Sequence, residues 1–147
     1  MSTMTAQATQ VYEVYIKATP QQIWDAITKP EFTEKYFYGS RITVSEDEYL
    51  SLDGKGDTLV RGKVLEIDAP HRLVTGWRAL YDPETATEED SRVTWEIEPQ
   101  DGGYSKLRVV HDQLEGAPKT ALSVAGGWSY VLSGLKTLLE TGKPLAG

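Results

Sequence analysis

Residues 122–140 read LSVAGGWSYVLSGLKTLLE, and their apolar side chains recur at steps of three and four residues. This is the period of one face of an α-helix. Pro118 suits the first turn of such a helix, while Gly142 followed by Pro144 is a stop signal. The pattern therefore predicts one long amphipathic helix from Pro118 to about Glu140, and another part of the chain must cover its apolar face.

Three glycines interrupt this helical pattern: Gly126, Gly127 and Gly134. Each costs about 0.5–1 kcal/mol relative to alanine in a helix interior. Counted around the helix, Gly126 and Gly127 point to the side of Trp128 and not beneath it. We therefore predict that the glycines lie on a flank that packs closely against neighbouring elements, while Trp128 and Leu135 face inward.

The middle of the chain, from about residue 41 to 113, has the alternating pattern of β-strands. Segment 92–98, RVTWEIE, directs three apolar side chains to one face: Val93, Trp95 and Ile97. Segment 104–114 returns with a histidine among its inward residues: Leu107, Val109 and His111. Further strands are predicted at 41–45, 48–52, 57–68 and 73–80. Since short turns join most of these strands, we expect an antiparallel sheet that twists and curls.

Two mid-strand glycines, Gly62 and Gly76, and the N-terminal segment complete the pattern. Gly62 in segment 57–68 predicts a bulge or bend. Residues 11–18, VYEVYIKA, alternate as a strand. Thr19, Pro20 and Gln22 then form the pattern of a capping box and start a short helix. Pro30 is expected to open a second short helix, residues 30–37.

The order of elements predicts an α+β fold. A curved antiparallel sheet of about seven strands wraps around the long C-terminal helix, and two short helices follow the first strand. We expect residues 1–10 to form a flexible tail and residues 11–147 to form a single domain.

Composition excludes several classes of function. With a net charge of −7, nucleic acids and anionic membranes are poor partners. The chain has no cysteine and thus no disulfide or thiolate site, which fits a cytoplasmic location. It has no P-loop and no Gly-x-Ser-x-Gly elbow. Neither a metal site nor a bound cofactor is expected. The acidic clusters 46–48 and 88–90 are read as solvated loops.

Four stretches resemble the START-like superfamily, and within it the family of the activator of heat shock protein 90 ATPase. These stretches are VYIKATPQQIWDAITKPEFTEKYF (14–37), GKVLEIDAPHRLVTGW (62–77), VTWEIEPQDGGYSKLRVVHDQL (93–114) and GGWSYVLSGLKTLLETGKP (126–144). The resemblance implies the helix-grip fold, with a cavity between the long helix and the curved sheet. It also implies a link to the stress response. The chain differs from the family around residues 45–57 and in its acidic loop after Trp77.

Aromatic side chains supply the candidate ligand-binding residues, since Trp and Tyr combine an apolar body with a polar tip. Strand parity places Trp77, Trp95 and His111 on the inner face of the sheet. We expect seven residues to line the cavity that the resemblance implies and to bind the ligand: Tyr36, Phe37, Trp77, Trp95, His111, Trp128 and Leu135. No catalytic residue is assigned. His111 is either a buried structural histidine or a polar group on the cavity wall, and Trp24 is more readily explained as core.

Three functions remain open at this point. The first is binding of a small hydrophobic molecule, such as a lipid, steroid or aromatic polyketide. The second, implied by the resemblance, is a protein-interaction module that modulates a chaperone ATPase. The third is a cavity enzyme of the cyclase or hydrolase type that uses His111 as its acid or base.

Overall fold

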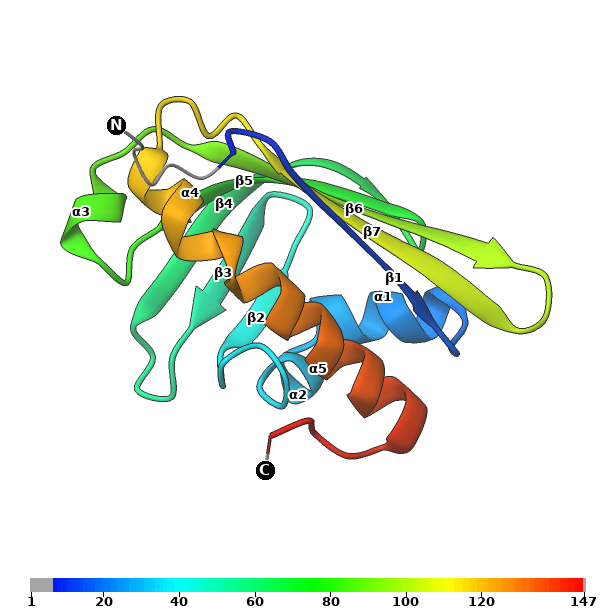
Figure 1. The fold of residues 1–147 in the computed structure, drawn as a ribbon. Coiled ribbons are helices and arrows are strands. Elements are labelled where there is room, and N and C mark those ends of the chain that lie inside the picture. The colour runs from blue at the N-terminus through cyan, green and yellow to red at the C-terminus, as the bar shows by residue number, and fades with distance from the viewer. Residues whose placement is uncertain (1–6, 147) are drawn as a thin grey trace.

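Across residues 7–146, which the computed structural model describes, the chain forms a seven-stranded antiparallel sheet and five helices (Figure 1). The strands lie in the order β1-β7-β6-β5-β4-β3-β2. Their bounds are β1 Gln10–Ile16, β2 Arg41–Val44, β3 Glu48–Leu52, β4 Thr58–Asp68, β5 Arg72–Ala79, β6 Ser91–Gln100 and β7 Tyr104–Asp112. Most of the predicted tail, residues 1–6, lies outside the described residues, and β1 already begins at Gln10.

The helices are α1 Pro20–Thr28, α2 Pro30–Thr33, α3 Pro83–Ala86, α4 Pro118–Ala125 and α5 Gly127–Thr141. Four of them, α1, α2, α4 and α5, lie on one face of the curved sheet, while α3 lies at one end of the sheet, in the connection between β5 and β6. In Figure 1, α4 and α5 run diagonally across the sheet, while α1 and α2 lie beside α5 at its lower end. The predicted α+β class, the sheet, the two short helices and the long C-terminal helix are confirmed. α2 is shorter than predicted, because residues 34–37 continue as turns.

The C-terminal helical segment is divided at Gly126, where we had expected an uninterrupted helix. Gly126 is exposed, and an added Cβ would meet nothing within 4 Å, so the predicted close packing is wrong for this glycine. It is correct for Gly134, where a Cβ would lie 3.1 Å from the Cβ of Tyr36. Trp128 and Leu135 are buried, as predicted. α5 ends at Gly142, whose φ of 77° is the left-handed value common after helices.

The start of α1 is fixed by the predicted capping box. The Thr19 hydroxyl accepts a hydrogen bond from the Gln22 amide at 3.2 Å, and the Gln22 side chain accepts one from the Thr19 amide at 2.8 Å. Two backbone donors of the first turn are thereby satisfied. The helix presents Ile23, Trp24 and Ile27 to the core, which anchors α1 beneath the sheet.

Two glycines bring strands β4 and β5 unusually close together. A Cβ built on Gly62 would lie 1.8 Å from the carbonyl oxygen of Gly76. On its other side, Gly62 pairs with Tyr49 of β3. The rings of Tyr49 and Trp77 meet with their centroids 5.8 Å apart. Of the predicted bulge or bend, the bulge lies further along β4, because the register of the β4–β5 ladder shifts between Val64 and Glu66 and not at Gly62.

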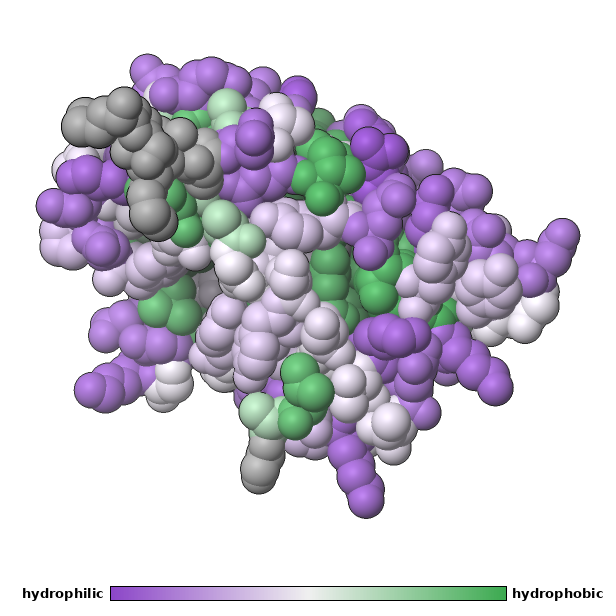
Figure 2. Space-filling view, in the orientation of Figure 1, coloured by the Kyte–Doolittle hydropathy of each residue, from purple (hydrophilic) through white to green (hydrophobic). Residues whose placement is uncertain are grey.

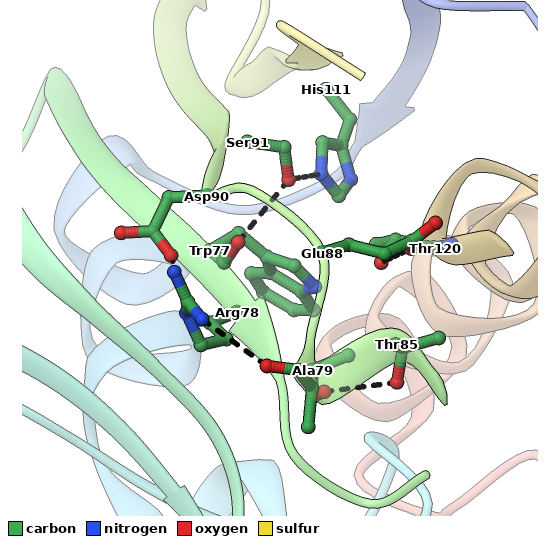
Figure 3. A network of polar contacts seen from close by, with 10 residues as sticks. Trp77, Arg78, Ala79, Thr85, Glu88, Asp90, Ser91, His111 and Thr120 are labelled. Carbon is green, nitrogen blue, oxygen red and sulfur yellow. Dashed lines mark hydrogen bonds and ion pairs between the residues drawn. The ribbon is translucent and has the colours of Figure 1, made fainter. Parts of the chain in front are cut away.

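The acidic segment 88–90 is part of the packed structure and not only a solvated loop. Glu88 accepts hydrogen bonds from the backbone amides of Lys119 and Thr120, each at 2.8 Å, at the start of α4. Figure 3 shows Glu88 beside Thr120. Burial by itself raises the pKa of Glu88, but these hydrogen bonds outweigh it and hold the pKa below its usual value. Asp90 pairs with Arg78 at 2.6 Å. The segment therefore caps α4 and ties it to β5.

On the face of the molecule shown in Figure 2, hydrophilic and pale colours predominate, and apolar colour appears in the seam between α5 and β1 and in several separate patches. Within the part of the chain that the structure describes, no helix is long and apolar enough to cross a membrane.

Candidate functional site

A cavity of about 490 Å³ opens between the C-terminal helices, strands β3 to β5 and the turn after α2. This volume lies within the range of ligand pockets. Its apolar wall consists of Phe37, Leu59, Val60, Trp77, Val124, Trp128 and Val131. The remaining lining residues are mostly hydroxyl-bearing: Tyr38, Ser40, Ser51, Asp53, Tyr81, Ser123 and Gly127. An apolar wall with a few polar groups suits a ligand with a hydrophobic body.

Three of the seven predicted site residues line this cavity: Phe37, Trp77 and Trp128. The other four do not: Tyr36, Trp95, His111 and Leu135 are buried in the core behind it. Tyr36 donates its hydroxyl to the carbonyl of Ala26 at 2.7 Å. Trp95 packs edge-on against Trp128, with the ring centroids 5.5 Å apart. These residues support the wall of the cavity without reaching its space.

His111 connects three segments through a chain of hydrogen bonds, part of which is seen in Figure 3. The indole Nε1–H of Trp128 donates to His111 Nδ1 at 3.1 Å. His111 Nε2 lies 2.7 Å from the Ser91 hydroxyl, which lies 3.3 Å from the carbonyl oxygen of Trp77. Because an indole nitrogen can only donate, Nδ1 must accept and Nε2 must carry the proton. His111 therefore donates to Ser91, and Ser91 donates to the carbonyl of Trp77.

This network requires the neutral form of His111. Burial lowers the pKa of His111 to about 4, and the nearby Asp112 carboxylate opposes this only in part. That carboxylate forms a two-fold ion pair with Arg92, at 2.6 and 2.9 Å. The imidazole is thus uncharged at neutral pH, and both of its nitrogens are engaged. The buried structural interpretation of His111 fits this geometry, and the residue holds Trp128 in place.

Several buried polar atoms on the inner face of the sheet have no hydrogen-bond partner within residues 7–146: Tyr49 OH, Thr75 Oγ1, Trp77 Nε1 and Trp95 Nε1. Burial raises the pKa of Tyr49 well above its ordinary value, so its hydroxyl stays protonated. Of these residues, Trp77 also lines the cavity. Such unpaired groups are costly in a folded protein. The inner face therefore retains unused hydrogen-bonding capacity beside the cavity.

The sequence interpretation missed the tyrosines at the edge of the cavity. Tyr38 is 63% exposed and stacks on Tyr130, with the ring centroids 5.1 Å apart. The Tyr81 hydroxyl lies 2.5 Å from that of Ser123 on α4. Both tyrosines lie in connecting segments, where side-chain direction follows no period. The abundance of tyrosine was the one signal that could have indicated them.

Asp53 is the single charged residue that lines the cavity in the described part of the chain. Its Oδ1 accepts hydrogen bonds from the backbone amides of Asp57 and Lys55, at 2.9 and 2.8 Å. These two bonds, that of Asp57 first, lower the pKa of Asp53, so the side chain is a carboxylate at neutral pH. Among residues 7–146, no three His, Asp or Glu side chains gather as ligands for a metal ion.

Known structures share this architecture at low sequence identity. Protein MLL2253 from Mesorhizobium loti is 21% identical, with a TM-score of 0.72 over 90% of this chain and 96% of that one. PFC0360w, an HSP90 activator from Plasmodium falciparum, is 19% identical, with a TM-score of 0.68 over 94% and 99%. DynU16, a putative protein in the dynemicin biosynthetic locus, is 20% identical, with a TM-score of 0.74 over 94% of this chain and 49% of that one. At these identities the likeness shows the fold alone.

Sequence comparison gives the family. No curated protein matches the chain. The family model described as "Activator of Hsp90 ATPase homolog 1-like protein" matches residues 17–140, which include strands β2 to β7, helices α1 to α4 and all of α5 except Thr141. The chain belongs to the Activator of Hsp90 ATPase homolog 1-like family.

Proposed function

We propose that this protein binds a small hydrophobic molecule, of the size of a lipid, steroid or aromatic polyketide, in the cavity beside Trp128. The observation that carries the proposal is the open cavity of about 490 Å³ with an aromatic wall. A protein of this size ordinarily fills its core, because close packing stabilises it. An apolar space that stays open while its wall is fixed by hydrogen bonds is suited to a ligand.

Two neighbouring glycines provide a matched test of this cavity. Gly127 lines it, and a Cβ added there would lie 3.5 Å from the Tyr38 hydroxyl, an ordinary contact. Leucine at this position keeps the backbone and extends further atoms into the space beside Tyr38. Gly126 is the control, because a Cβ added there meets nothing within 4 Å. Both substitutions replace a glycine at the start of α5, so their effects on the helix itself should be similar.

The experiment titrates a neutral hydrophobic probe, pyrenylmethanol, into each protein while tryptophan fluorescence is recorded. We expect wild type and Gly126→Leu to bind alike and Gly127→Leu to bind at least about ten-fold more weakly. Thermal unfolding of both variants checks that the fold is intact. If no probe binds to wild type, or if Gly127→Leu binds as well as Gly126→Leu, the proposed cavity function is wrong.

Family membership favours a second candidate, in which the protein is an interaction module for a chaperone ATPase. The structural likeness to an HSP90 activator supports this candidate at the level of fold. The test measures steady-state ATP turnover by a purified Hsp90 with and without this protein. Faster turnover supports the candidate, and unchanged turnover across a range of concentrations contradicts it.

Catalysis by His111 receives no support from the geometry. The imidazole lies outside the cavity lining, and its two nitrogens are occupied by Trp128 and Ser91. A general acid or base must reach the substrate within hydrogen-bond distance. We therefore do not include an enzymatic reaction in the proposed function.

A further inference from the structure

The charge of the cavity restricts which hydrophobic molecules can occupy it. No Lys, Arg or His is found among the lining residues in the described part of the chain, and Asp53 supplies a carboxylate. From this distribution we infer that the cavity selects an amine-bearing aromatic amphiphile, whose ammonium group lies toward Asp53, and discriminates against fatty acids and other carboxylates. This inference rests on the proposed function, and it adds the chemical class of the ligand.

The carboxylate of Asp53 is held in a fixed orientation. Its Oδ1 accepts two backbone amides of the β3–β4 turn, which anchors the side chain at the cavity. Such an anchored group loses little conformational freedom when it binds a cation. The nearest cation in sequence, Lys55, is exposed in the same turn and does not line the cavity. An ammonium group of the ligand would therefore meet Asp53 without displacing a cavity-lining lysine or arginine.

The aromatic wall, like Asp53, favours a cationic ligand over an anionic one. Faces of Trp and Tyr rings attract cations through their quadrupole. Trp77 and Trp128 lie with centroids 5.5 Å apart, and Tyr38 and Tyr81 stand nearer the surface. A carboxylate ligand would find only neutral donors, such as the unpaired Nε1–H of Trp77. The net charge of −7 adds a weak, long-range preference for cations.

One feature could have favoured an anion, namely the N-terminus of α5 at Gly127, because helix N-termini carry partial positive charge. However, α4 ends at Ala125, directly before α5 begins. The partial negative charge at the end of α4 therefore lies against the partial positive charge at the start of α5, and the two largely cancel at the cavity. Asp53 therefore remains the one charged residue among the cavity-lining residues in the described part of the chain, with the exposed Lys55 nearby in the same turn.

The test uses three probes that share one ring system: pyrenylmethylamine, pyrenylmethanol and pyrenylacetate. Their dissociation constants are measured by tryptophan quenching at an ionic strength of about 0.15 M, where exposed charges beyond roughly 8 Å are screened. For wild type we expect the amine to bind most tightly and the carboxylate to bind at least about ten-fold more weakly than the amine. Gly127→Leu should weaken all three, which locates them in the cavity.

Two isosteric substitutions isolate the charge. Asp53→Asn keeps an oxygen that can accept the two turn amides and should reduce the amine-over-carboxylate ratio to about two-fold or less. Asp57→Asn removes one charge from the same turn at an exposed position that does not line the cavity, and it should leave the ratio unchanged. Equal binding of amine and carboxylate to wild type, or equal effects of the two substitutions on the ratio, overturns the inference about the ligand's charge. Either result leaves the proposed binding of a hydrophobic molecule standing. Failure of all three probes to bind overturns the proposed function as well.

Discussion

The hydrogen-bond chain through His111 makes a quantitative prediction about acid stability. Replacing His111 with phenylalanine keeps a ring of similar shape but removes the acceptor for Trp128 Nε1. An unpaired buried donor costs about 1–3 kcal/mol. At about pH 7.5, therefore, we expect the variant to be less stable than wild type by that amount.

The sign of this difference changes with pH. His111 has a pKa of about 4 in the folded protein and an ordinary value of 6.5 when unfolded. Above pH 6.5 the ring is neutral in both states and contributes no pH dependence. As the pH falls from 6.5 through 4, the unfolded chain binds a proton that the folded protein excludes, so wild type loses stability. Since one unit of pKa corresponds to about 1.4 kcal/mol, the loss amounts to roughly 3 kcal/mol below pH 4.

The assay is urea unfolding of wild type and His111→Phe, followed by tryptophan fluorescence from about pH 7.5 to about pH 4. Carboxylates titrate in both proteins, and their effect cancels in the difference. We expect the stability difference between wild type and variant to fall by roughly 3 kcal/mol across this range, so that near pH 4 the two are equally stable or the variant is the more stable. A constant difference at every pH, or an imidazole that titrates near pH 6.5 by NMR, would refute the hydrogen-bond assignment.

Two further substitutions test the packing that shapes the cavity. Gly62→Ala places a Cβ 1.8 Å from a backbone oxygen and should cost about 3 kcal/mol or more in urea unfolding, while Gly54→Ala, with nothing within 4 Å, should have little effect. Glu88→Ala removes the acceptor at the start of α4 and should cost about 1–2 kcal/mol at neutral pH, with Glu46→Ala as the exposed control. This loss should shrink in acid, as the pH falls through the lowered pKa of Glu88 and the wild-type carboxylate becomes protonated. Equal effects of the two members of either pair would contradict the contacts.

Local sequence patterns predicted the elements well. The alternation of Val93, Trp95 and Ile97 gave the buried face of β6, because successive side chains in a strand must point to opposite sides. The capping box at Thr19 and Gln22 gave the start of α1, because it depends on contacts within four residues. The same reasoning placed His111 on the inner face.

Contacts between distant segments could not be predicted in this way. Parity placed His111 inward, but its partners Trp128 and Ser91 lie 17 and 20 residues away in sequence, and only the folded sheet brings them together. The approach of Gly62 to Gly76 also depends on the register of two strands. Asp53 and Tyr81 line the cavity from turns and loops, where no period reveals side-chain direction.

The most direct test of ligand binding in this cavity uses the four tryptophans, since each contributes one indole N–H signal to a proton–nitrogen NMR spectrum. Trp77 and Trp128 line the cavity, whereas Trp24 and Trp95 are buried outside its lining. Titration with pyrenylmethanol should shift the Trp77 and Trp128 signals strongly and the other two weakly. Shifts confined to Trp24 and Trp95, or no shift at saturating probe, would contradict a ligand site in this cavity.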